Sequence, residues 1–451
     1  MGKELTVIRS LQRKHMLNSR VREHVQTTLQ GIAKKAKEDK KYRFCDVYRL
    51  INRISLMDAW YDLNKRAASG IDGVTAREYE KDLIDNIVGL EGRLKEKRYK
   101  AKGVKRVYIP KPNGKKRPLG MPCLEDKLVQ QAAARILNAI FEQDFHPFSY
   151  GYRPERGALD GIKEFTRELS FGRYSYIVEV DIKGFFDNID HEWLIRMLEQ
   201  RINDGAFIGL IRKWLSAGIL EEGIETIPER GTPQGGIVSP ILANIYLHYA
   251  IDLWMERVVK RRCEGQAYIV RYADDFVCAF QYRREAERFH AELEARLGKF
   301  GLETAKEKTR IISFSRFRKE EKTYFTFLGF EFRWGTDRNG KDRIKRRTSG
   351  KKMQASIKGF TVWIKKFRNK RLRRIFEVLN SKLRGYYNYF GVIGNFRSLK
   401  NYFDRIMRLL YKWLNRRSQR RSFNYRGFVE ILDYFKIERP RITQVASQPI
   451  S

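Results

Sequence analysis

The sequence predicts an α+β fold in which short apolar strands lie between longer amphipathic helices. Apolar residues recur at three- and four-residue steps over most of the chain, which is the period of a half-buried helix. A few short apolar runs are instead bounded by turn residues, which is typical of strands and hairpins. The 451 residues suffice for two or three domains, and 42% hydrophobic residues suffice to fill their cores.

The charge of the chain indicates a polyanionic partner. Lys and Arg number 92 against 54 Asp and Glu, and the formal net charge is +38. Residues 341–451 hold 30 of the basic residues and only 6 of the acidic ones. A folded chain this basic most often binds nucleic acid.

The cysteines and the hydropathy indicate in which cellular compartment the protein is expected. The four cysteines are scattered without a CxxC pair, so neither a structural zinc site nor a disulfide framework is indicated. The basic N-terminus lacks the apolar core of a signal peptide, and no apolar run approaches the ~20 residues of a membrane span. We therefore expect a protein of the bacterial cytoplasm or nucleoid that does not associate with a membrane.

The first part of the chain predicts helices around one hairpin. Helices are expected over most of 1–65, including two around 47–54 and 56–66, and again over 78–96. Residues 105–122 alternate like a strand, turn at a Pro-Asn-Gly sequence and return as a second strand. A helix follows from Asp126 to Phe141.

The middle of the chain predicts strands that end in acids. Residues 176–182 form a nearly unbroken apolar strand that ends in an acid. Residues 267–280 predict a strand–turn–strand hairpin with two adjacent acids at its tip. The other expected elements are helices at 191–202, 207–219, 241–261 and 286–301 and strands at 309–314 and 324–332.

The polar stretch at 334–350 is predicted to be a loop and the best domain boundary. Apolar periodicity lapses throughout this stretch. From Lys351 onward the pattern is helical, basic and aromatic.

Three aspartates form the candidate catalytic site. Asp181 follows a buried strand, where a carboxylate is costly unless it is paired or bound to metal. Asp274 and Asp275 repel each other at a tight turn. Mg²⁺ would relieve both costs, and two such ions can activate a 3′-hydroxyl and stabilise a leaving pyrophosphate. For each acid alone a turn or strand cap is the commoner interpretation, but their joint occurrence in a basic chain favours a metal site.

These residues resemble the motifs of reverse transcriptases. YADD at 272–275 looks like the catalytic box, DIKGFFDNIDH at 181–191 like the first catalytic strand, and GTPQGGIVSPILANIYLH at 231–248 like the loop and helix between them. Further blocks of the family resemble residues 109–130, 148–162, 301–314 and 327–332. SGIDGVT at 69–75 and LRGYYNYFG at 383–391 resemble the group II intron reverse transcriptase/maturase branch.

The resemblance implies a right-hand polymerase with a helical N-terminal extension at 1–70 and fingers at 71–160. An RNA-recognition-like palm, an antiparallel sheet with helices behind it, would occupy 161–334, and a basic helical thumb/maturase domain 335–451. Such a protein would use dNTPs and two Mg²⁺ ions to extend a DNA primer on an RNA template. It would also bind its group II intron RNA, assist splicing, and copy the intron into target DNA during retrohoming.

The resemblance also assigns roles at the catalytic centre. Asp181, Asp274 and the backbone carbonyl of Ile182 would bind metal, and Asp275 would support the pair. Lys308 would donate a proton to pyrophosphate and Lys306 is an equal candidate, although a solvated lysine is the commoner interpretation for either.

Other residues of the resemblance would bind the nucleotide. Lys111 and Arg117 flank the hairpin turn and would reach the triphosphate, unless they are solvated hairpin charges. Phe186 would lie under the incoming sugar and exclude a 2′-hydroxyl, unless it is a core aromatic like its neighbour Phe185. Gln234 would hold the nucleotide by hydrogen bonds, unless it is an ordinary loop glutamine.

A third group would bind nucleic acid. Arg153 would contact the template, or it could equally be a structural ion-pair partner. Arg371, Arg373 and Arg374 would grip intron RNA, unless they belong to the solvated face of an ordinary helix bundle.

Many members of this branch continue into a DNA-binding domain and an endonuclease that bears Cys and His. Because such cysteines are absent here, we expect the compact class without an endonuclease. Two alternatives remain open: an RNA-folding module whose polymerase has decayed, and a domesticated relative in phage defence, repair or CRISPR adaptation. The intact YADD and PQG sequences argue against decay, and an intron RNA flanking the gene would argue against domestication.

Overall fold

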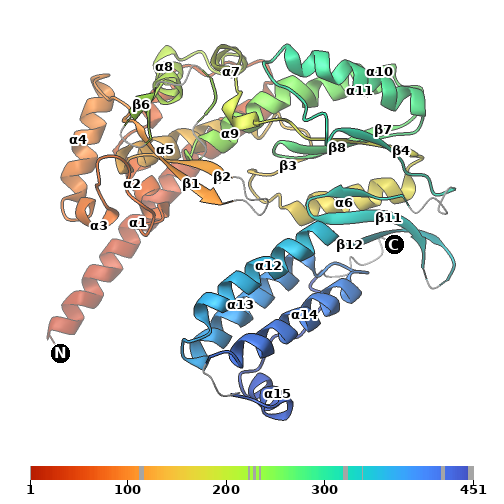
Figure 1. Ribbon diagram of the computed structural model, residues 1–451. Helices are drawn as coiled ribbons and strands as arrows, with labels where there is room; N and C mark the ends of the chain where they lie inside the picture. Colours follow the sequence, from red (N-terminus) through yellow and green to blue (C-terminus); the bar gives the residue numbers. More distant parts are fainter. Residues whose placement is uncertain are drawn as a thin grey trace.

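The computed structural model describes residues 2–110, 116–221, 224–226, 230–232, 235–317, 323–337, 339–417 and 422–444. Helices gather around a small sheet in the N-terminal part, a larger sheet carries helices on both faces, and the C-terminal helices form a bundle beside it (Figure 1). The α+β prediction is confirmed.

The N-terminal helices pack around α5 (Leu124–Phe141), which contacts both α1 (Gly2–Glu38) and α2 (Arg53–Asp62). The other helices of this part are η1, a 3-10 turn (Tyr48–Leu50), α3 (Ala76–Tyr79) and α4 (Leu83–Lys95). The single helix expected around 47–54 is wrong, since the short η1 ends at Leu50 and residues 53–54 already belong to α2. The Asn52 side chain accepts hydrogen bonds from the Ile54 and Ser55 amides, and this cap starts α2 afresh.

The hairpin expected at 105–122 is confirmed. Strand β1 (Val104–Pro110) pairs antiparallel with β2 (Lys116–Met121), and β1 also pairs in parallel with β5 (Ile219–Glu221). Strand β6 (Ile224–Thr226) completes the order β2-β1-β5-β6. A segment more than a hundred residues downstream thus holds the base of the hairpin.

The central sheet has the strand order β3-β7-β8-β4-β9. Its strands are β3 (Ser149–Tyr150), β4 (Tyr176–Val180), β7 (Ala267–Tyr272), β8 (Asp275–Phe280) and β9 (Arg310–Ser313). The helical segments between them are α6 (Ala158–Phe171), η2 (Phe185–Asp187), α7 (His191–Leu198), α8 (Gly205–Leu215), α9 (Ser239–Leu247), the π-helical η3 (His248–Asp252) and η4 (Met255–Val259), α10 (Lys260–Arg262) and α11 (Arg283–Gly298). In Figure 1, α11 lies on one face of the sheet and α6 on the other.

The central strands are apolar at nearly every position because both faces of the sheet are buried. Val178 and Val180 of β4 belong to one hydrophobic core, which α9 and α11 share. Ile177 belongs to a second core, which contains Phe165 of α6 and the C-terminal helices. A strand covered on both faces reads as a continuous apolar run rather than an alternating one.

The loop expected at 334–350 is wrong. Strand β11 (Phe330–Thr336) pairs antiparallel with β12 (Asp342–Thr348), and β10 (Phe325–Phe327) pairs with β11. Along β12 only alternate residues are buried, and the positions between them are basic. The strand therefore keeps a two-residue period with little apolar content, and a division of the chain at 334/335 would cut β11.

The C-terminal helices are α12 (Gly350–Phe367), α13 (Leu372–Phe390), α14 (Phe396–Leu414) and α15 (Tyr425–Tyr434). Ser349 caps α12 by accepting a hydrogen bond from the Lys352 amide. Tyr386 of α13 stacks on Tyr402 of α14 with ring centroids 3.7 Å apart. In the described part of the chain, none of the helices combines the length and apolar character that a membrane crossing requires.

Candidate active site

The three aspartates of the candidate site meet at one edge of the central sheet. Strand β4 pairs antiparallel with β8, with Val180 opposite Phe276. Asp181 directly follows Val180, and Asp275 begins β8. The antiparallel register therefore brings together acids that lie more than ninety residues apart in the chain.

The backbone at Asp181 is fixed by the segment that precedes β9. Ala305 donates its amide to the Asp181 carbonyl at 2.8 Å, and Lys183 donates its amide to the Glu303 carbonyl at 2.9 Å. These two bonds flank an antiparallel bridge between Ile182 and Thr304. In that pattern the Ile182 carbonyl points away from the bridge, as a metal-binding role would require.

Lys308 contacts the side-chain carboxylate of Asp181. Its Nζ donates to Asp181 Oδ2 at 2.5 Å, and this bond raises the pKa of Lys308. Lys306 lies elsewhere, where its ammonium pairs with Glu294 at 2.9 Å. Of the two lysines that the sequence left equal, Lys308 contacts a candidate aspartate and Lys306 pairs with Glu294 instead.

The turn that carries Asp274 and Asp275 is held in an unusual backbone conformation. Ala273 has φ +56°, which is uncommon for a residue with a Cβ. Its carbonyl accepts a hydrogen bond from Arg271 Nη1 at 3.1 Å. The Arg271 side chain is fully buried and forms a two-point ion pair with Asp252, with an Nε–Oδ1 distance of 2.7 Å.

The loop that contains Gly151 packs against this turn. The Ala273 amide donates to the Tyr150 carbonyl at 3.3 Å. Gly151 has φ +75°, and a Cβ placed on it would lie only 2.7 Å from the Ala273 nitrogen. Asn244 donates to the Gly151 carbonyl at 2.8 Å and accepts from Arg271 at 3.1 Å. Asn244 therefore joins this loop to the buried ion pair.

Arg271, Asp252 and Asn244 were not predicted from the sequence. A signal was present, because an arginine within an otherwise apolar strand is costly unless it finds a buried partner. The sequence does not say which acid that partner is. Asp252 lies on the π-helical segment η3, an irregularity that is frequent near functional sites.

The electrostatics of the site favour a bound cation. Burial, and then the nearby carboxylates of Asp274 and Asp181, raise the pKa of Asp275 to about 6, although Lys352 and Lys308 oppose the shift. Asp275 nevertheless reaches solvent, although the residues that follow it in β8 are buried. A divalent cation would offset the repulsion between these carboxylates.

The donor set suits an ion that shares its ligands with a substrate. Among the described residues, no group of three or more His, Cys, Asp or Glu side chains lies close enough together to hold a metal ion by itself. An ion at the aspartates would therefore need further ligands from substrate and water. Mg²⁺ is commonly held in this way, by one or two carboxylates together with substrate phosphates and water.

Phe186 lies beside the loop that carries the PQG sequence. Its neighbour Phe185 is buried, and Phe186 itself is half-buried against the same core. The Phe186 carbonyl accepts from the Thr232 amide at 2.8 Å. A Cβ on Gly231, which has φ +88°, would lie 2.9 Å from that carbonyl oxygen. Glycine is therefore required where the loop approaches η2.

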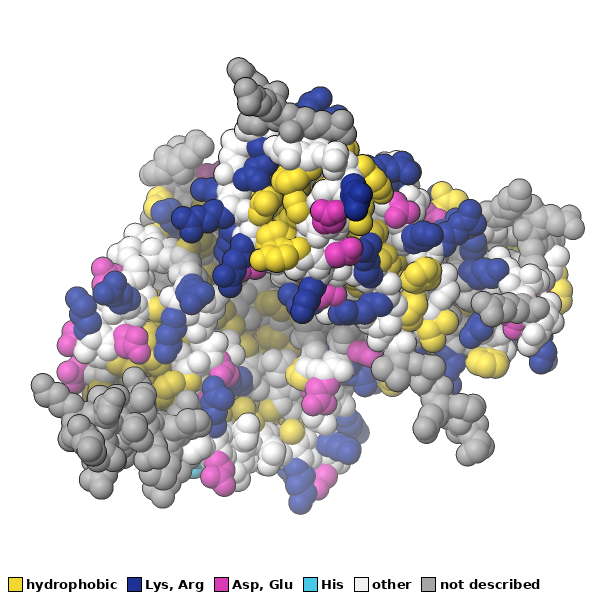
Figure 2. Space-filling model, turned by 90° about the horizontal axis from the view of Figure 1, so that it is seen from below, with side chains coloured by type: hydrophobic (Ala, Val, Ile, Leu, Met, Phe, Trp, Pro, Cys, Tyr) yellow, Lys and Arg dark blue, Asp and Glu magenta, His cyan; other side chains and the backbone are white. Residues whose placement is uncertain are grey.

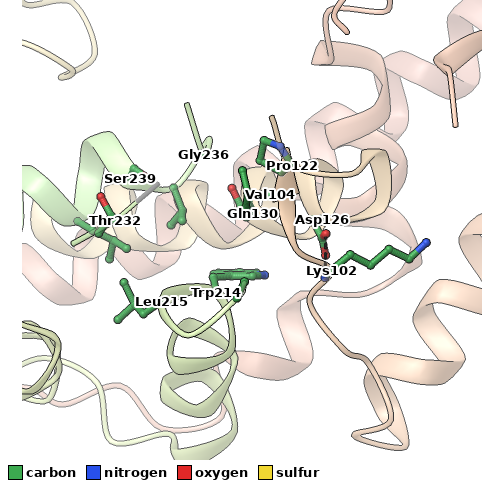
Figure 3. A pocket seen from close by; sticks show the side chains of 13 residues that line it. Lys102, Val104, Pro122, Asp126, Gln130, Trp214, Leu215, Thr232, Gly236 and Ser239 are labelled. Carbon is green, nitrogen blue, oxygen red and sulfur yellow. Dashed lines mark hydrogen bonds between the residues drawn. The ribbon is translucent and has the colours of Figure 1, made fainter. Parts of the chain in front are cut away.

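Two cavities adjoin this loop. An open cleft of about 300 Å³ lies between β1–β2 and residues 230–232, lined by Arg106, Tyr108 and Asp187 among others. Behind the loop, a cavity of about 20 Å³ lies among Gln130, Trp214 and Thr232 (Figure 3). The second cavity has room for about one water and is too small for a substrate.

Side chains from α5 support the loop from behind. Gln130 accepts a hydrogen bond from the Ile237 amide at 2.9 Å. Asp126, also on α5, is buried and accepts from the Tyr99 hydroxyl, and burial raises its pKa to about 6. The helix thus joins the loop to the first part of the chain.

The remaining site candidates differ in how the structure places them. Lys111 and Gln234 lie outside the described residues, and Arg117 is described only by its backbone, opposite Ile109 in β2. The Arg153 side chain is 2% exposed, pairs with Glu142 at 2.6 Å and donates to two backbone carbonyls. These contacts are those of the structural ion-pair alternative.

The three arginines at the start of α13 are exposed. Arg371 is the N-cap residue, while Arg373 and Arg374 share Glu377 at 3.3 and 3.4 Å. One acid therefore serves two arginines. Viewed from below, the molecule is hollowed near its middle, and Lys and Arg side chains border the hollow (Figure 2).

A central sheet with helices on both faces, between an N-terminal hairpin region and a C-terminal helix bundle, is the arrangement of a right-hand polymerase. Residues 109–332 match the family model described as reverse transcriptase (RNA-dependent DNA polymerase). The chain is 32% identical to the group II intron-encoded protein LtrA of Lactococcus lactis, over 84% of this chain and 76% of that protein.

Shorter matches point the same way. The protein YkfC of Escherichia coli is 37% identical over 40% of this chain and 48% of its own length. The protein named nuclear intron maturase 4, mitochondrial, of Arabidopsis thaliana is 28% identical over 29% of this chain and 16% of its own length. The chain belongs to the family of group II intron-encoded reverse transcriptases and maturases. Its activity is that of an RNA-directed DNA polymerase and intron maturase, and reverse transcriptases use divalent metal ions.

Proposed function

We propose that the chain extends a DNA primer on an RNA template with dNTPs, and that Asp181, Asp274 and Asp275 hold two Mg²⁺ ions for this reaction. The observation that carries the proposal is the meeting of three carboxylates at one sheet edge, where burial and mutual repulsion raise the pKa of Asp275 to about 6. Bound Mg²⁺ would activate the primer 3′-hydroxyl and stabilise the leaving pyrophosphate. Primer extension on an RNA template over a Mg²⁺ series tests this, and DNA synthesis that needs no Mg²⁺ would contradict it.

The protein side chains divide the remaining work. The Asp181 and Asp274 carboxylates and the Ile182 carbonyl are the proposed metal ligands, and Asp275 keeps the pair in place. Lys308, which donates to Asp181 in this structure, is then released towards the pyrophosphate and can donate a proton to it.

The incoming dNTP is proposed to enter the cleft between β1–β2 and residues 230–232. Its volume of about 300 Å³ lies at the lower end of the range for ligand pockets. Lys111 and Arg117 would contact the triphosphate and Gln234 the rest of the nucleotide. Phe186, beside the same loop, would lie under the sugar.

Replacing Phe186 by alanine should relax the choice of sugar. The ring fills the space that a 2′-hydroxyl would need, so its loss should raise the kcat/KM for a ribonucleotide relative to the matching deoxynucleotide by roughly 10-fold or more, equivalent to about 1.4 kcal/mol. Steady-state kinetics with both nucleotides measures this ratio.

Phe186→Tyr is the matched control, because it keeps the ring and should keep the discrimination. A thermal unfolding midpoint close to that of the unsubstituted protein shows that Phe186→Ala is folded. An unchanged sugar ratio in that folded variant would mean that Phe186 is only a core residue.

The C-terminal helices are proposed to bind intron RNA, which supports splicing and later copying of the intron into target DNA. Residues 341–451 hold 30 basic and 6 acidic residues, so most of the positive charge has no acidic partner within this segment. Structured RNA is recognised largely through shape, phosphates and 2′-hydroxyls, which suits a fixed basic surface.

Replacing Arg371, Arg373 and Arg374 by alanine should weaken intron binding and splicing more than primer extension. For every phosphate that the variant no longer neutralises, the slope of log affinity against log salt should fall by about one unit. Binding, splicing and extension on a short primer–template are measured on the same protein across a salt series. The matched control is alanine at Arg283, Arg284 and Lys299, three exposed basic residues in and beside α11. Equal losses of splicing and extension would contradict the maturase role of this surface.

A further inference from the structure

The hairpin formed by β11 and β12 has an apolar inner face and a basic outer face. Along β12, Ile344 is buried in the core shared with the C-terminal helices. Arg343, Lys345 and Arg347 alternate with the buried positions and are exposed. Side chains two residues apart on a strand share one face, so these three form a row with a spacing of roughly 7 Å.

The neighbouring strand contributes one cation and one acid to this face, Arg333 and Glu331, which pair with each other. Arg333 of β11 lies directly opposite Lys345, and like charges in that position are destabilising. Glu331, opposite Arg347, contributes an acid on this face, but it already accepts hydrogen bonds from Arg333 at 3.0 Å and from the Gly350 amide at 3.0 Å. We call the set of Arg333, Arg343, Lys345 and Arg347 the basic ribbon.

The charges of the basic ribbon act on one another. Partial burial, and then the guanidinium of Arg333, lower the pKa of Arg347, and Arg397 from α14 adds to the effect while Glu331 opposes it. A row of cations that is unfavourable by itself becomes favourable when a polyanion lies along it.

The ribbon leads away from the catalytic edge. At one end, the turn between β10 and β11 packs Gly329 against Lys352, one of the charges that act on Asp275. From Phe330, next to that turn, β11 runs seven residues to Thr336, a length of roughly 20 Å at the usual rise. The far end of the ribbon therefore lies well beyond the reach of a nucleotide at the aspartates.

We infer that the outer face of β11–β12 binds the phosphate backbone of folded intron RNA outside the primer–template duplex. The inference rests on the proposed binding of intron RNA and names one surface that would perform it. The ligand is a polynucleotide, because the cations form a row rather than a pocket. It is a folded RNA, because the surface is a rigid ribbon backed by a core and suits recognition by shape and phosphate position.

The test compares two triple variants of the full chain. Arg343→Thr, Lys345→Thr and Arg347→Thr together remove three charges from the ribbon while keeping residues that favour strands. The matched control removes three exposed charges elsewhere, with Arg283→Gln, Arg284→Gln and Lys299→Gln in and beside α11. The probes are a transcribed group II intron RNA and a short RNA–DNA primer–template.

The ribbon variant should bind the intron RNA about 10-fold more weakly or worse near 0.15 M salt, with a log–log salt slope smaller by roughly 2 to 3 units. Primer extension on the short duplex should stay within about two-fold of the unsubstituted protein, which also shows that the variant is folded. The control variant should lose little intron binding, and Arg343→Lys with Arg347→Lys should retain most of it because the charges remain.

Three results would overturn the inference. If the ribbon variant and the control variant bind intron RNA with equal affinity, the outer face of β11–β12 is only a solvated surface. An equal loss on the short duplex would assign the face to the primer–template. If the unsubstituted protein binds no intron RNA while it extends primers, the proposed binding of intron RNA fails together with the inference. If the unsubstituted protein binds intron RNA and the ribbon variant binds it equally well, only the inference fails.

Discussion

Asp274→Asn combined with Asp275→Asn should abolish cDNA synthesis on a primed RNA template. Both substitutions replace a charged carboxylate by a neutral amide of the same shape at the edge where β4 and β8 meet. Loss of these metal-binding oxygens should cost roughly 1000-fold or more in rate, equivalent to about 4 kcal/mol of transition-state stabilisation. The measurement is primer extension at saturating Mg²⁺ and dNTP.

The same variant should not lose stability. In the protein without metal, burial and the neighbouring carboxylates raise the pKa of Asp275 to about 6, so its charged form is disfavoured. Removing the charge relieves that cost, and the thermal unfolding midpoint should be equal or higher. A protein that becomes inactive without becoming less stable has lost a functional group rather than its fold.

A matched control comes from the same edge of the sheet. Glu303→Gln removes an exposed carboxylate that pairs with Lys183 and should leave extension largely intact. Near-normal extension by the double aspartate variant at saturating Mg²⁺ would exclude these residues as the catalytic acids.

Asp252→Ala should cause a large loss of stability. The substitution leaves the fully buried guanidinium of Arg271 without its carboxylate partner, and breaking a buried pair in this way costs about 3–5 kcal/mol. The unfolding midpoint in urea should fall clearly, and activity should fall with it, because Arg271 also holds the Ala273 carbonyl of the catalytic turn. Denaturation followed by circular dichroism measures the first effect.

A second variant separates stability from positioning. Asp252→Leu combined with Arg271→Met replaces the ion pair by apolar side chains and should recover much of the stability that Asp252→Ala removes. It removes the donor to the Ala273 carbonyl, so kcat should remain low while KM for the primer–template changes little. Recovery of both stability and kcat would show that the pair only supports the fold.

The placement of the three candidate aspartates at strand ends follows from the sequence alone. The apolar residues before Asp181 and on both sides of Asp274 and Asp275 predict buried strands from local sequence alone. The structure contains these strands. The hairpin at 105–122 is confirmed for the same reason, because its turn residues and its alternation are local properties. The seven ordered motifs likewise identified the family.

The partners of buried and charged side chains were decided only by the tertiary structure. The sequence offered Lys306 and Lys308 equally, but the segment 303–305 bridges to Ile182 and turns Lys308 towards Asp181. It left Arg153 open between template and ion pair, and in the fold this side chain is enclosed by Glu142 and two backbone carbonyls.

The hairpin β11–β12 could not be predicted from the periodicity of apolar residues. Periodicity records how much of an element is buried, and an element whose inward positions include Arg346 and Thr348 carries too little apolar content to register as a strand. The family and the strand ends could be predicted from the sequence alone, since these depend on short-range order, and the same strand ends led to the three candidate aspartates. Three features depend instead on contacts between segments far apart in the chain, which form only when the chain folds. They are the register between distant strands, the Arg271–Asp252 pair and the basic outer face of β11–β12.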